Sequence, residues 1–308
     1  MTMRVAIIGQ QDFGKAVLEA FQKRGDEVAA VFCAPEKEGA RPDALRTAAQ
    51  AAGLTVHQFK SLRAPEAVDA MQAANADIGI MAFVLQFAPQ DFVNIPKHGT
   101  IQFHPSLLPK YRGPSSINWP VARGETETGL TIFRPTDGLD EGAVILQKKT
   151  AVGENDTLGS VYFDRLFPMG VEAMLEAADL VIAGKHTETI QDERQASYEG
   201  WFREAEAKIH WNNHVDVIHN TIRGADPAPG AWTTYNGQKL QLFDSRKELT
   251  RTFGAVKGRV GEVVESANGK IVIAAQGGRI HVTKAKLGDA KKVAADTAGI
   301  PVGAFLGS

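Results

Sequence analysis

The chain has 308 residues, of which 44% are hydrophobic and 23% charged, with a formal net charge of −2 and a pI near 6.5. This composition is typical of a globular protein large enough for two domains, and the near-neutral charge excludes a general field that attracts nucleic acid. No apolar run approaches the ~20 residues that span a membrane, and the first residues lack a signal-peptide pattern, so we expect a cytoplasmic protein with no membrane partner.

The first part of the chain alternates short apolar runs with helical patterns, which is typical of an α/β domain with a parallel sheet. We expect strands at 4–8, 27–33, 54–59, 77–83, 99–104, 130–135 and 143–149, and helices at 14–25, 42–53, 64–75, 114–124 and about 157–184. Pro120 is expected to break its helix, and Pro168 and Gly170 are candidate break points in the long one. The pattern predicts a Rossmann-like, mostly parallel N-terminal domain. The single cysteine, Cys33, ends an apolar run and is expected to be a buried structural thiol.

The composition of the chain changes after residue 185. Residues 186–200 are polar and loop-like, which predicts a linker. A helix at 214–225 is followed by short strands, and two of the turns between them, Asn236-Gly237 and Asn268-Gly269, are strong hairpin signals. These strands predict a small C-terminal antiparallel β-barrel of the OB-like kind. We therefore place a catalytic domain at 1–203 and a β-barrel domain at 204–308.

The first glycine loop, residues 9–14, follows the first predicted strand. It lacks the G-x-G-x-x-G spacing of a dinucleotide site and the lysine of a P-loop. We interpret it as a tight strand-to-helix turn, with a loop that lines a substrate cleft as the alternative.

Two segments contain the candidate catalytic residues. His104, in QFHPSLLP, directly follows a predicted strand, and ligands of open α/β sheets bind beyond the carboxyl ends of the strands. Two prolines and the turn at 111–113 are expected to hold this loop rigid. The second segment, TDGLDEG, lies between two strands and would by itself suit a simple turn. Together with His104, its Asp140 indicates a carboxylate that orients or charges an imidazole.

The segments H-P-S-L-L-P-x-x-R-G and D-G-L-D-x-G resemble the formyltransferase family that uses 10-formyltetrahydrofolate, and the likeness covers essentially the whole chain. The ordered run LQFAP, HPSLLP, YRG, INW and DGLD is similar to the hydrolase domain of 10-formyltetrahydrofolate dehydrogenase. The C-terminal part is similar to that of methionyl-tRNA formyltransferase. The resemblance implies 10-formyltetrahydrofolate as the formyl donor, with no metal. It also implies no NAD(P), because the family's oxidation step belongs to a further aldehyde-dehydrogenase domain for which 308 residues leave no room.

The resemblance also implies the site residues. The family's catalytic histidine and aspartate fall on His104 and Asp140, and its catalytic asparagine position falls on Gln102, whose amide is one methylene longer. Whether Gln102 replaces that asparagine is left open. The cofactor-binding residues implied by the loops at 81–89 and 135–140 are Phe83, Leu85, Phe87, Pro89, Asp137 and Leu139. For the first three of these, ordinary core packing is the alternative.

Formyl transfer passes through a tetrahedral oxyanion, which must be stabilised while protons move. We assign the oxyanion to His104 with Gln102, and the deprotonation of water to Asp140. Water is the expected acceptor, giving formate and tetrahydrofolate; methionyl-tRNA, a small amine or amino sugar, and a non-catalytic folate or nucleotide module are the alternatives.

Nucleic acid is the less favoured acceptor on sequence grounds. The stretch APEKEGARPDAL lacks the longer basic insertion of the tRNA enzymes. The cations of the C-terminal part are interpreted as scattered over a solvated face: Lys239, Arg246, Lys247, Arg251, Lys257, Arg259 and Lys270. The sequence does not determine the oligomeric state.

Overall fold

The structure is a computed structural model that describes residues 2–250 and 257–307, so Arg251 lies outside the described residues. The chain divides into two compact units, which we describe separately. The first comprises residues 1–113, 129–149 and 165–198, and the second comprises 114–128, 150–164 and 199–308. The single domain boundary between 203 and 204 stays a prediction.

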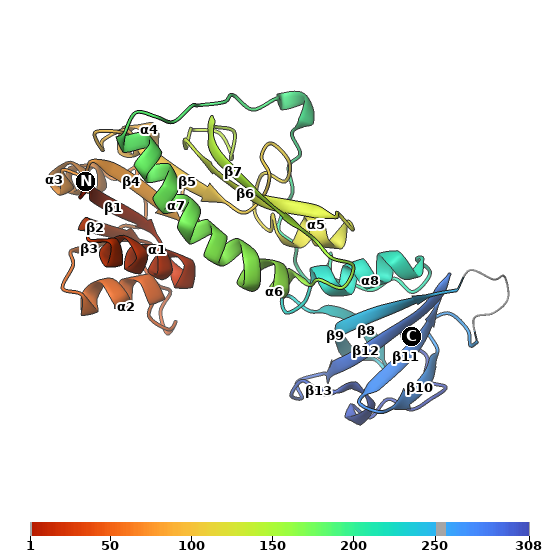
Figure 1. The fold of residues 1–308 in the computed structure, drawn as a ribbon. Coiled ribbons are helices and arrows are strands. Elements are labelled where there is room, and N and C mark those ends of the chain that lie inside the picture. Colours follow the sequence, from red (N-terminus) through yellow and green to blue (C-terminus); the bar gives the residue numbers. More distant parts are fainter. Residues whose placement is uncertain (1, 251–256, 308) are drawn as a thin grey trace. The chain divides into compact units, whose positions relative to one another are not determined.

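The first unit is built on a seven-stranded sheet with the order β3-β2-β1-β4-β5-β6-β7 (Figure 1). Its strands are β1 (Arg4–Gly9), β2 (Glu27–Cys33), β3 (Val56–Gln58), β4 (Ile78–Ala82), β5 (Thr100–His104), β6 (Glu127–Phe133) and β7 (Val144–Ala151). Strands β1 to β5 pair in parallel with their neighbours, whereas β6 is antiparallel to β5. The expected α/β arrangement with a mostly parallel sheet is confirmed.

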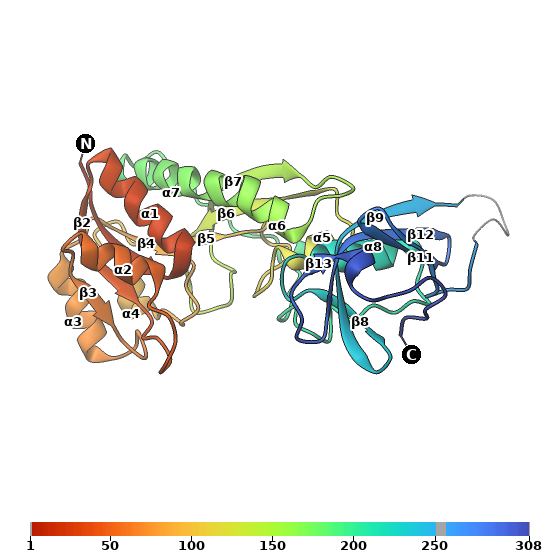
Figure 2. The same ribbon diagram turned by 90° about the horizontal axis from the view of Figure 1, so that it is seen from below.

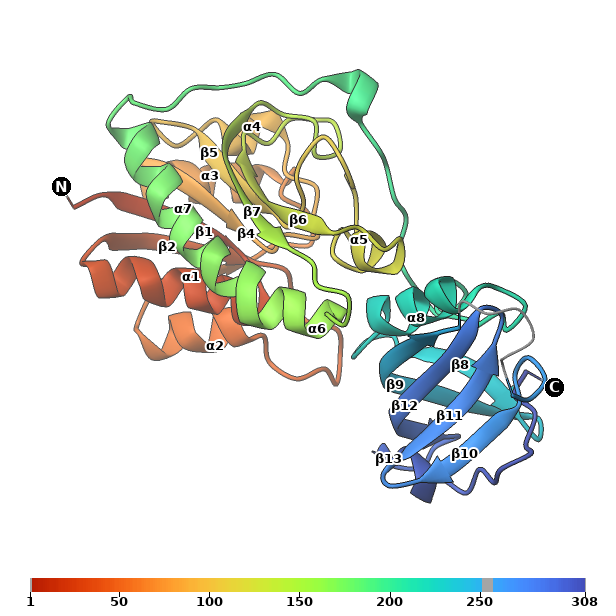
Figure 3. The same ribbon diagram turned by 45° about the vertical axis from the view of Figure 1, so that its right-hand side comes forward.

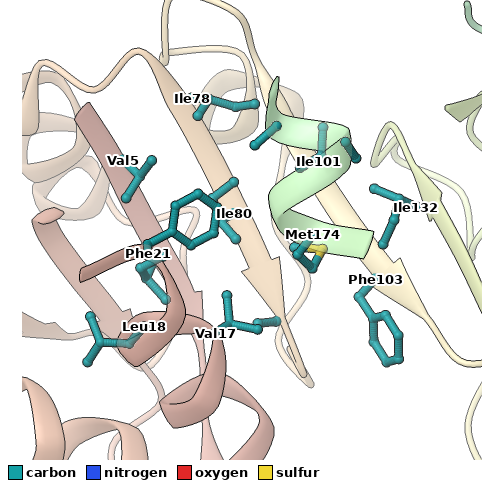
Figure 4. Close-up of a cluster of buried hydrophobic side chains, with 14 of the residues drawn as sticks. Val5, Val17, Leu18, Phe21, Ile78, Ile80, Ile101, Phe103, Ile132 and Met174 are labelled. Carbon is teal, nitrogen blue, oxygen red and sulfur yellow. The ribbon is translucent and has the colours of Figure 1, made fainter. Parts of the chain in front are cut away.

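Helices cover both faces of this sheet (Figure 2). Helices α1 (Gln11–Arg24), α2 (Ala44–Ala51) and α7 (Phe167–Ile182) pack on one face, and α3 (Pro65–Ala74) and α4 (Gln90–Val93) pack on the other. The alternation of side chains along a strand explains the two cores, because Val5 and Ile7 of β1 face α1 whereas Ala6 and Ile8 face away. Figure 4 shows the first core, in which Phe21 and Met174 meet the sheet.

The long helix expected at 157–184 is interrupted. It consists of α6 (Leu158–Val161), a π-helical turn (Tyr162–Leu166) and α7, with Pro168 in the first turn of α7. Gly170 is not a break point, because it lies inside α7, where an added Cβ would stand 2.6 Å from the Phe103 ring. Its lack of a side chain instead lets α7 pack closely against Phe103. The helix expected at 114–124 is reduced to α5 (Asn118–Ala122), with Pro120 in its first turn, where proline removes no helical hydrogen bond.

The second unit holds a six-stranded sheet with the order β10-β11-β12-β9-β8, and β13 pairs with β12 (Figure 3). The elements are α8 (Val215–Gly224), β8 (Ala231–Tyr235), β9 (Gln238–Leu249), β10 (Val263–Ala267), β11 (Lys270–Ala275), β12 (Gly278–Leu287), β13 (Val293–Ala294) and a 3₁₀ turn (Ala295–Thr297). The two Asn-Gly hairpins are confirmed, because both residues of each pair adopt positive φ between paired strands.

The strands of this sheet pair antiparallel, as expected, but the closed OB-like barrel is not confirmed. Within the described residues, the end strands β10 and β8 do not pair with each other. The apolar face of the sheet is buried by other parts of the unit, Ile218 and Ile222 of α8 and the C-terminal Ile300 and Leu306. Burial of this face therefore does not require closure.

Residues 185–198, which we call the strap, do not behave as the expected linker. The strap follows α7 (Figure 3) and contains one 3₁₀ turn (Glu193–Gln195). Thr189 exchanges two backbone hydrogen bonds with Val144, at 2.8 and 2.9 Å, and Glu188 accepts from Arg134 at 2.8 Å. The strap is irregular, but it is bound along its length to loops of the first unit.

No helix in the described ranges is long and apolar enough to cross a bilayer.

Candidate active site

The glycine loop at 9–14 is a strand-to-helix turn between β1 and α1. A Cβ on Gly9 would lie 2.0 Å from the carbonyl oxygen of Ala82, so glycine lets β1 approach β4 closely. The next residue, Gln10, donates its backbone N–H to the same oxygen. This geometry agrees with the tight-turn interpretation.

His104 is the last residue of β5, at the carboxyl end of the parallel part of the sheet. Its side chain is buried, and its Nε2 lies 2.8 Å from the carbonyl oxygen of Tyr111. A carbonyl only accepts hydrogen bonds, so Nε2 carries the hydrogen. In the neutral imidazole, Nδ1 is therefore the unprotonated nitrogen.

Asp140 faces that nitrogen. Its Oδ2 lies 3.6 Å from Nδ1 of His104 and accepts a hydrogen bond from the backbone N–H of Gly113 at 2.8 Å. Both side chains are about nine-tenths buried. The 3.6 Å separation is longer than a hydrogen bond. The two groups attract each other as an ion pair only when the imidazole is protonated. The structure thus brings together the histidine and the aspartate that the sequence singled out.

The turn Tyr111-Arg112-Gly113 supports both groups at once. Tyr111 provides the carbonyl that binds His104, and Gly113 provides the amide that binds Asp140. Between them, the fully buried Arg112 donates to Gln191, Glu193 and Tyr198 of the strap. This one turn therefore contacts both His104 and Asp140.

The loop between His104 and this turn is also held by side-chain hydrogen bonds, which the sequence did not lead us to expect. Thr131 of β6 donates from Oγ1 to the carbonyl of Ser106 at 2.7 Å and accepts from the N–H of Leu108 at 3.1 Å. Gln147 donates to the carbonyl of Leu108 at 2.7 Å. These bonds join the loop to two neighbouring strands and keep it rigid.

Gln102 lies two residues before His104 on β5, so the two side chains leave the same face of the strand. In the sheet, Gln102 is level with Met81, the residue before the end of β4, and with Phe133, the last residue of β6. The side chain is half-buried, and no hydrogen bond to its amide occurs among the described residues.

The predicted cofactor residues lie on the loops after β4 and β6, and Gln90, the first residue of α4, donates from Nε2 to the carbonyl of Pro135 at 3.1 Å. Leu85, Phe87 and Leu139 are exposed by 57%, 44% and 54%. Asp137 is also exposed, and Pro89 caps α4. Phe83 differs from the other apolar residues, because it packs against the hydrophobic core on the face of the sheet that α1 and α7 cover.

Two features beside the site were not identified from the sequence. Gln191 of the strap is buried and contacts the Asp140 loop, and the Oγ1 of Thr136 is buried with no partner in the described part of the chain. Gln191 stands in a polar segment without periodicity, so no local signal marks it.

The surface hollows lined by Arg24 and Asp179 lie elsewhere, near the amino ends of β1 and β2. Among the residues described, no group of three or more His, Cys, Asp or Glu side chains is arranged to hold a metal ion.

Comparison with protein-family models matches residues 3–178 to the formyl transferase family and residues 202–299 to the formyl transferase C-terminal domain. Cytosolic 10-formyltetrahydrofolate dehydrogenase of Mus musculus is 42% identical over 79% of this chain and 27% of that protein. The mitochondrial enzyme of the same species is 36% identical over 95% of this chain and 33% of the relative. The chain thus spans about a third or less of these dehydrogenases. Methionyl-tRNA formyltransferase of Geotalea uraniireducens is 30% identical over 94% of this chain and 92% of that enzyme.

Solved structures share the fold. HypX from Aquifex aeolicus in complex with tetrahydrofolic acid matches with a TM-score of 0.68 and 19% identity, over 93% of this chain and 44% of that one. WlaRD, a sugar 3N-formyl transferase, matches with a TM-score of 0.69 and 19% identity, over 94% of this chain and all of that one.

Proposed function

Because this chain belongs to the formyl transferase family, we propose that it removes the formyl group of 10-formyltetrahydrofolate and passes it to water, releasing formate and tetrahydrofolate. The observation that carries the proposal is the pairing of His104 and Asp140 at the carboxyl edge of the sheet.

The proposed reaction is an acyl transfer to water. Water adds to the formyl carbon as Asp140 accepts its proton, and the former carbonyl oxygen becomes an oxyanion. The bond from that carbon to N10 then breaks, the nitrogen receives a proton, and formic acid departs and loses its proton to solvent as formate. The proton held by Asp140 then passes to Nδ1 of His104, which restores both side chains. The protonated Nδ1 of His104 stabilises the oxyanion and supplies the proton, because Nε2 is engaged with Tyr111.

Gln102 is the second oxyanion group in this proposal. Its amide has no competing hydrogen bond in the described chain and leaves β5 on the face from which His104 also emerges. An amide N–H donates as well from glutamine as from asparagine, and the longer side chain places it one methylene further from β5.

The formyl donor would lie against the loops after β4 and β6. Leu85 and Phe87 on the first loop and Leu139 on the second are exposed apolar side chains, which would line a binding surface if the loops meet around the ligand. The guanidinium of Arg63 lies 4.5 Å from the Phe87 ring, which puts a cation beside an apolar wall. This combination suits a flat ring with a carboxylate tail.

The pairing of the C-terminal cations supports water over tRNA. Phosphate binding needs cations that are free to replace counterions. Five of the cations noted above pair with carboxylates of the chain: Lys239, Arg246, Lys247, Arg259 and Lys270 with Glu204, Asp244, Asp216, Glu262 and Glu265 respectively. The higher identity to the dehydrogenases than to the tRNA enzyme points the same way.

Transfer to methionyl-tRNA is the second candidate, because the match to a methionyl-tRNA formyltransferase covers 92% of that enzyme's own length. A single assay separates the two. Tetrahydrofolate release from 10-formyltetrahydrofolate is followed by absorbance with the protein alone, then with charged initiator tRNA, then with small amines. Release without an acceptor supports the hydrolase, whereas release only with tRNA or an amine supports a transferase and refutes the proposal.

A further inference from the structure

The strap reaches the Asp140 loop through one side chain. Gln191 donates from Nε2 to two backbone carbonyls, that of Asp140 at 2.9 Å and that of Gly142 at 2.7 Å. Only 6% of Gln191 is exposed, so these bonds are made away from bulk water. Both hydrogens of the amide nitrogen are used by the loop.

The orientation of this amide is set from the other side by Arg112. The Oε1 of Gln191 accepts from Nε of Arg112 at 3.1 Å and from Nη2 at 2.8 Å. A guanidinium only donates, so the amide oxygen must face Arg112 and the amide nitrogen must face the loop. Glu193 pairs with the same guanidinium and holds it in place.

The Asp140 loop needs such a support. Asp140 has φ of 54°, a left-handed conformation that few residues other than glycine adopt without cost. Two residues further along, a Cβ at Gly142 would lie 1.6 Å from the carbonyl oxygen of Arg134, so the two ends of the loop approach each other closely. The two carbonyls that Gln191 holds lie at these two positions.

We propose that Gln191 is a positioning residue, which holds the backbone of the Asp140 loop so that the carboxylate stays between the Gly113 amide and Nδ1 of His104. The inference rests on the proposed function. One turn, 111–113, thus supports the acid–base pair directly through its backbone and indirectly through Arg112 and Gln191.

The discriminating substitution is Gln191→Glu. The glutamate keeps an oxygen that accepts from Arg112, so the strap stays anchored. Its other oxygen cannot donate and places negative charge against two carbonyl oxygens, so the loop loses its support. The matched control is Arg194→Ala, on the same strap, where the side chain is 89% exposed and pairs with Asp192.

Two readouts are made on wild type and both variants. A displacement of about 1 Å at a catalytic group costs up to ~10²-fold in rate, so kcat for tetrahydrofolate release should fall at least tenfold in Gln191→Glu, with little change in the melting temperature. Hydrogen exchange at the Gly113 amide should accelerate, because its acceptor is the Asp140 carboxylate. Arg194→Ala should match wild type in both.

The outcomes separate the two proposals. Unchanged Gly113 exchange in Gln191→Glu overturns the positioning inference, whether or not the wild type turns over. Unchanged kcat in that variant, with an active wild type, also overturns it. An inactive wild type refutes the proposed function, and faster Gly113 exchange would then still support the positioning of Asp140. If Gln191→Glu does not fold, Gln191→Met, which loses the donors but keeps the volume, is measured in the same way.

Discussion

Replacing Asp140 by asparagine should abolish most turnover while leaving the fold nearly intact. Asparagine has almost the same shape, and its Oδ1 still accepts from the Gly113 amide that Asp140 binds at 2.8 Å. What is lost is the negative charge 3.6 Å from Nδ1 of His104 and the ability to take a proton from water.

The two effects differ enough in size to be told apart. A charge-assisted hydrogen bond that becomes neutral costs roughly 1 kcal/mol of stability, a small part of the ~5–15 kcal/mol of a typical domain. Loss of a general base costs ~10²–10⁴ in rate, which corresponds to about 3–5 kcal/mol of activation free energy. Activity should therefore fall far more than the folded population does.

The assay is acceptor-free tetrahydrofolate release, with the melting temperature measured on the same preparation. Glu141→Gln is the matched control, because it makes the same carboxylate-to-amide change one residue along, at an exposed position. Turnover of Asp140→Asn within about threefold of wild type, at equal folded fraction, would contradict the assignment of the base.

Three further outcomes follow from other sites. Gln102→Leu should lower kcat by ~10²–10³, the usual effect of removing an oxyanion donor, whereas Gln102→Asn should retain more activity; equal kcat in Gln102→Leu and wild type would exclude the oxyanion role. Burial holds the pKa of His219 down at about 4, from an ordinary value of 6.5. Between these two pH values the unfolded chain binds a proton that the folded chain does not, so stability should fall by about 3 kcal/mol as pH drops through this window, and His219→Gln should show a flatter melting-temperature profile. Burial and the neighbouring carboxylates raise the pKa of Cys33 to about 11, so iodoacetamide should label it at pH 8 only after unfolding.

The family and the proximity of His104 to Asp140 were accessible from the sequence. The HPSLLP and DGLD segments identify the family, and the comparisons confirm it. His104 and Asp140 were expected to meet because their two segments together resemble the family's catalytic motifs, and the structure places Nδ1 of His104 3.6 Å from Oδ2 of Asp140. The catalytic roles of these residues, the cofactor contacts and the cytoplasmic location stay predictions.

Where the sequence had no clear pattern, contacts between residues far apart in the chain determined the structure. Residues 185–198 have no hydrophobic period, so they suggested a linker, yet Gln191 and Glu193 bind the buried Arg112 from about 80 positions away in the chain. The antiparallel strands of the second unit were predictable from their Asn-Gly turns, but closure into a barrel was not. Closure depends on which surface buries the apolar face of the sheet, and here α8 and the C-terminal residues bury it.

The sequence by itself determined the alternating elements of the α/β sheet, because local hydrophobic period and turn residues act within a few positions. It also singled out His104, which ends β5, and Asp140, which lies in the loop between β6 and β7. Only the tertiary structure decided how those two groups are held, because the supporting hydrogen bonds join Tyr111, Gly113 and Gln191 to partners that chain order does not reveal.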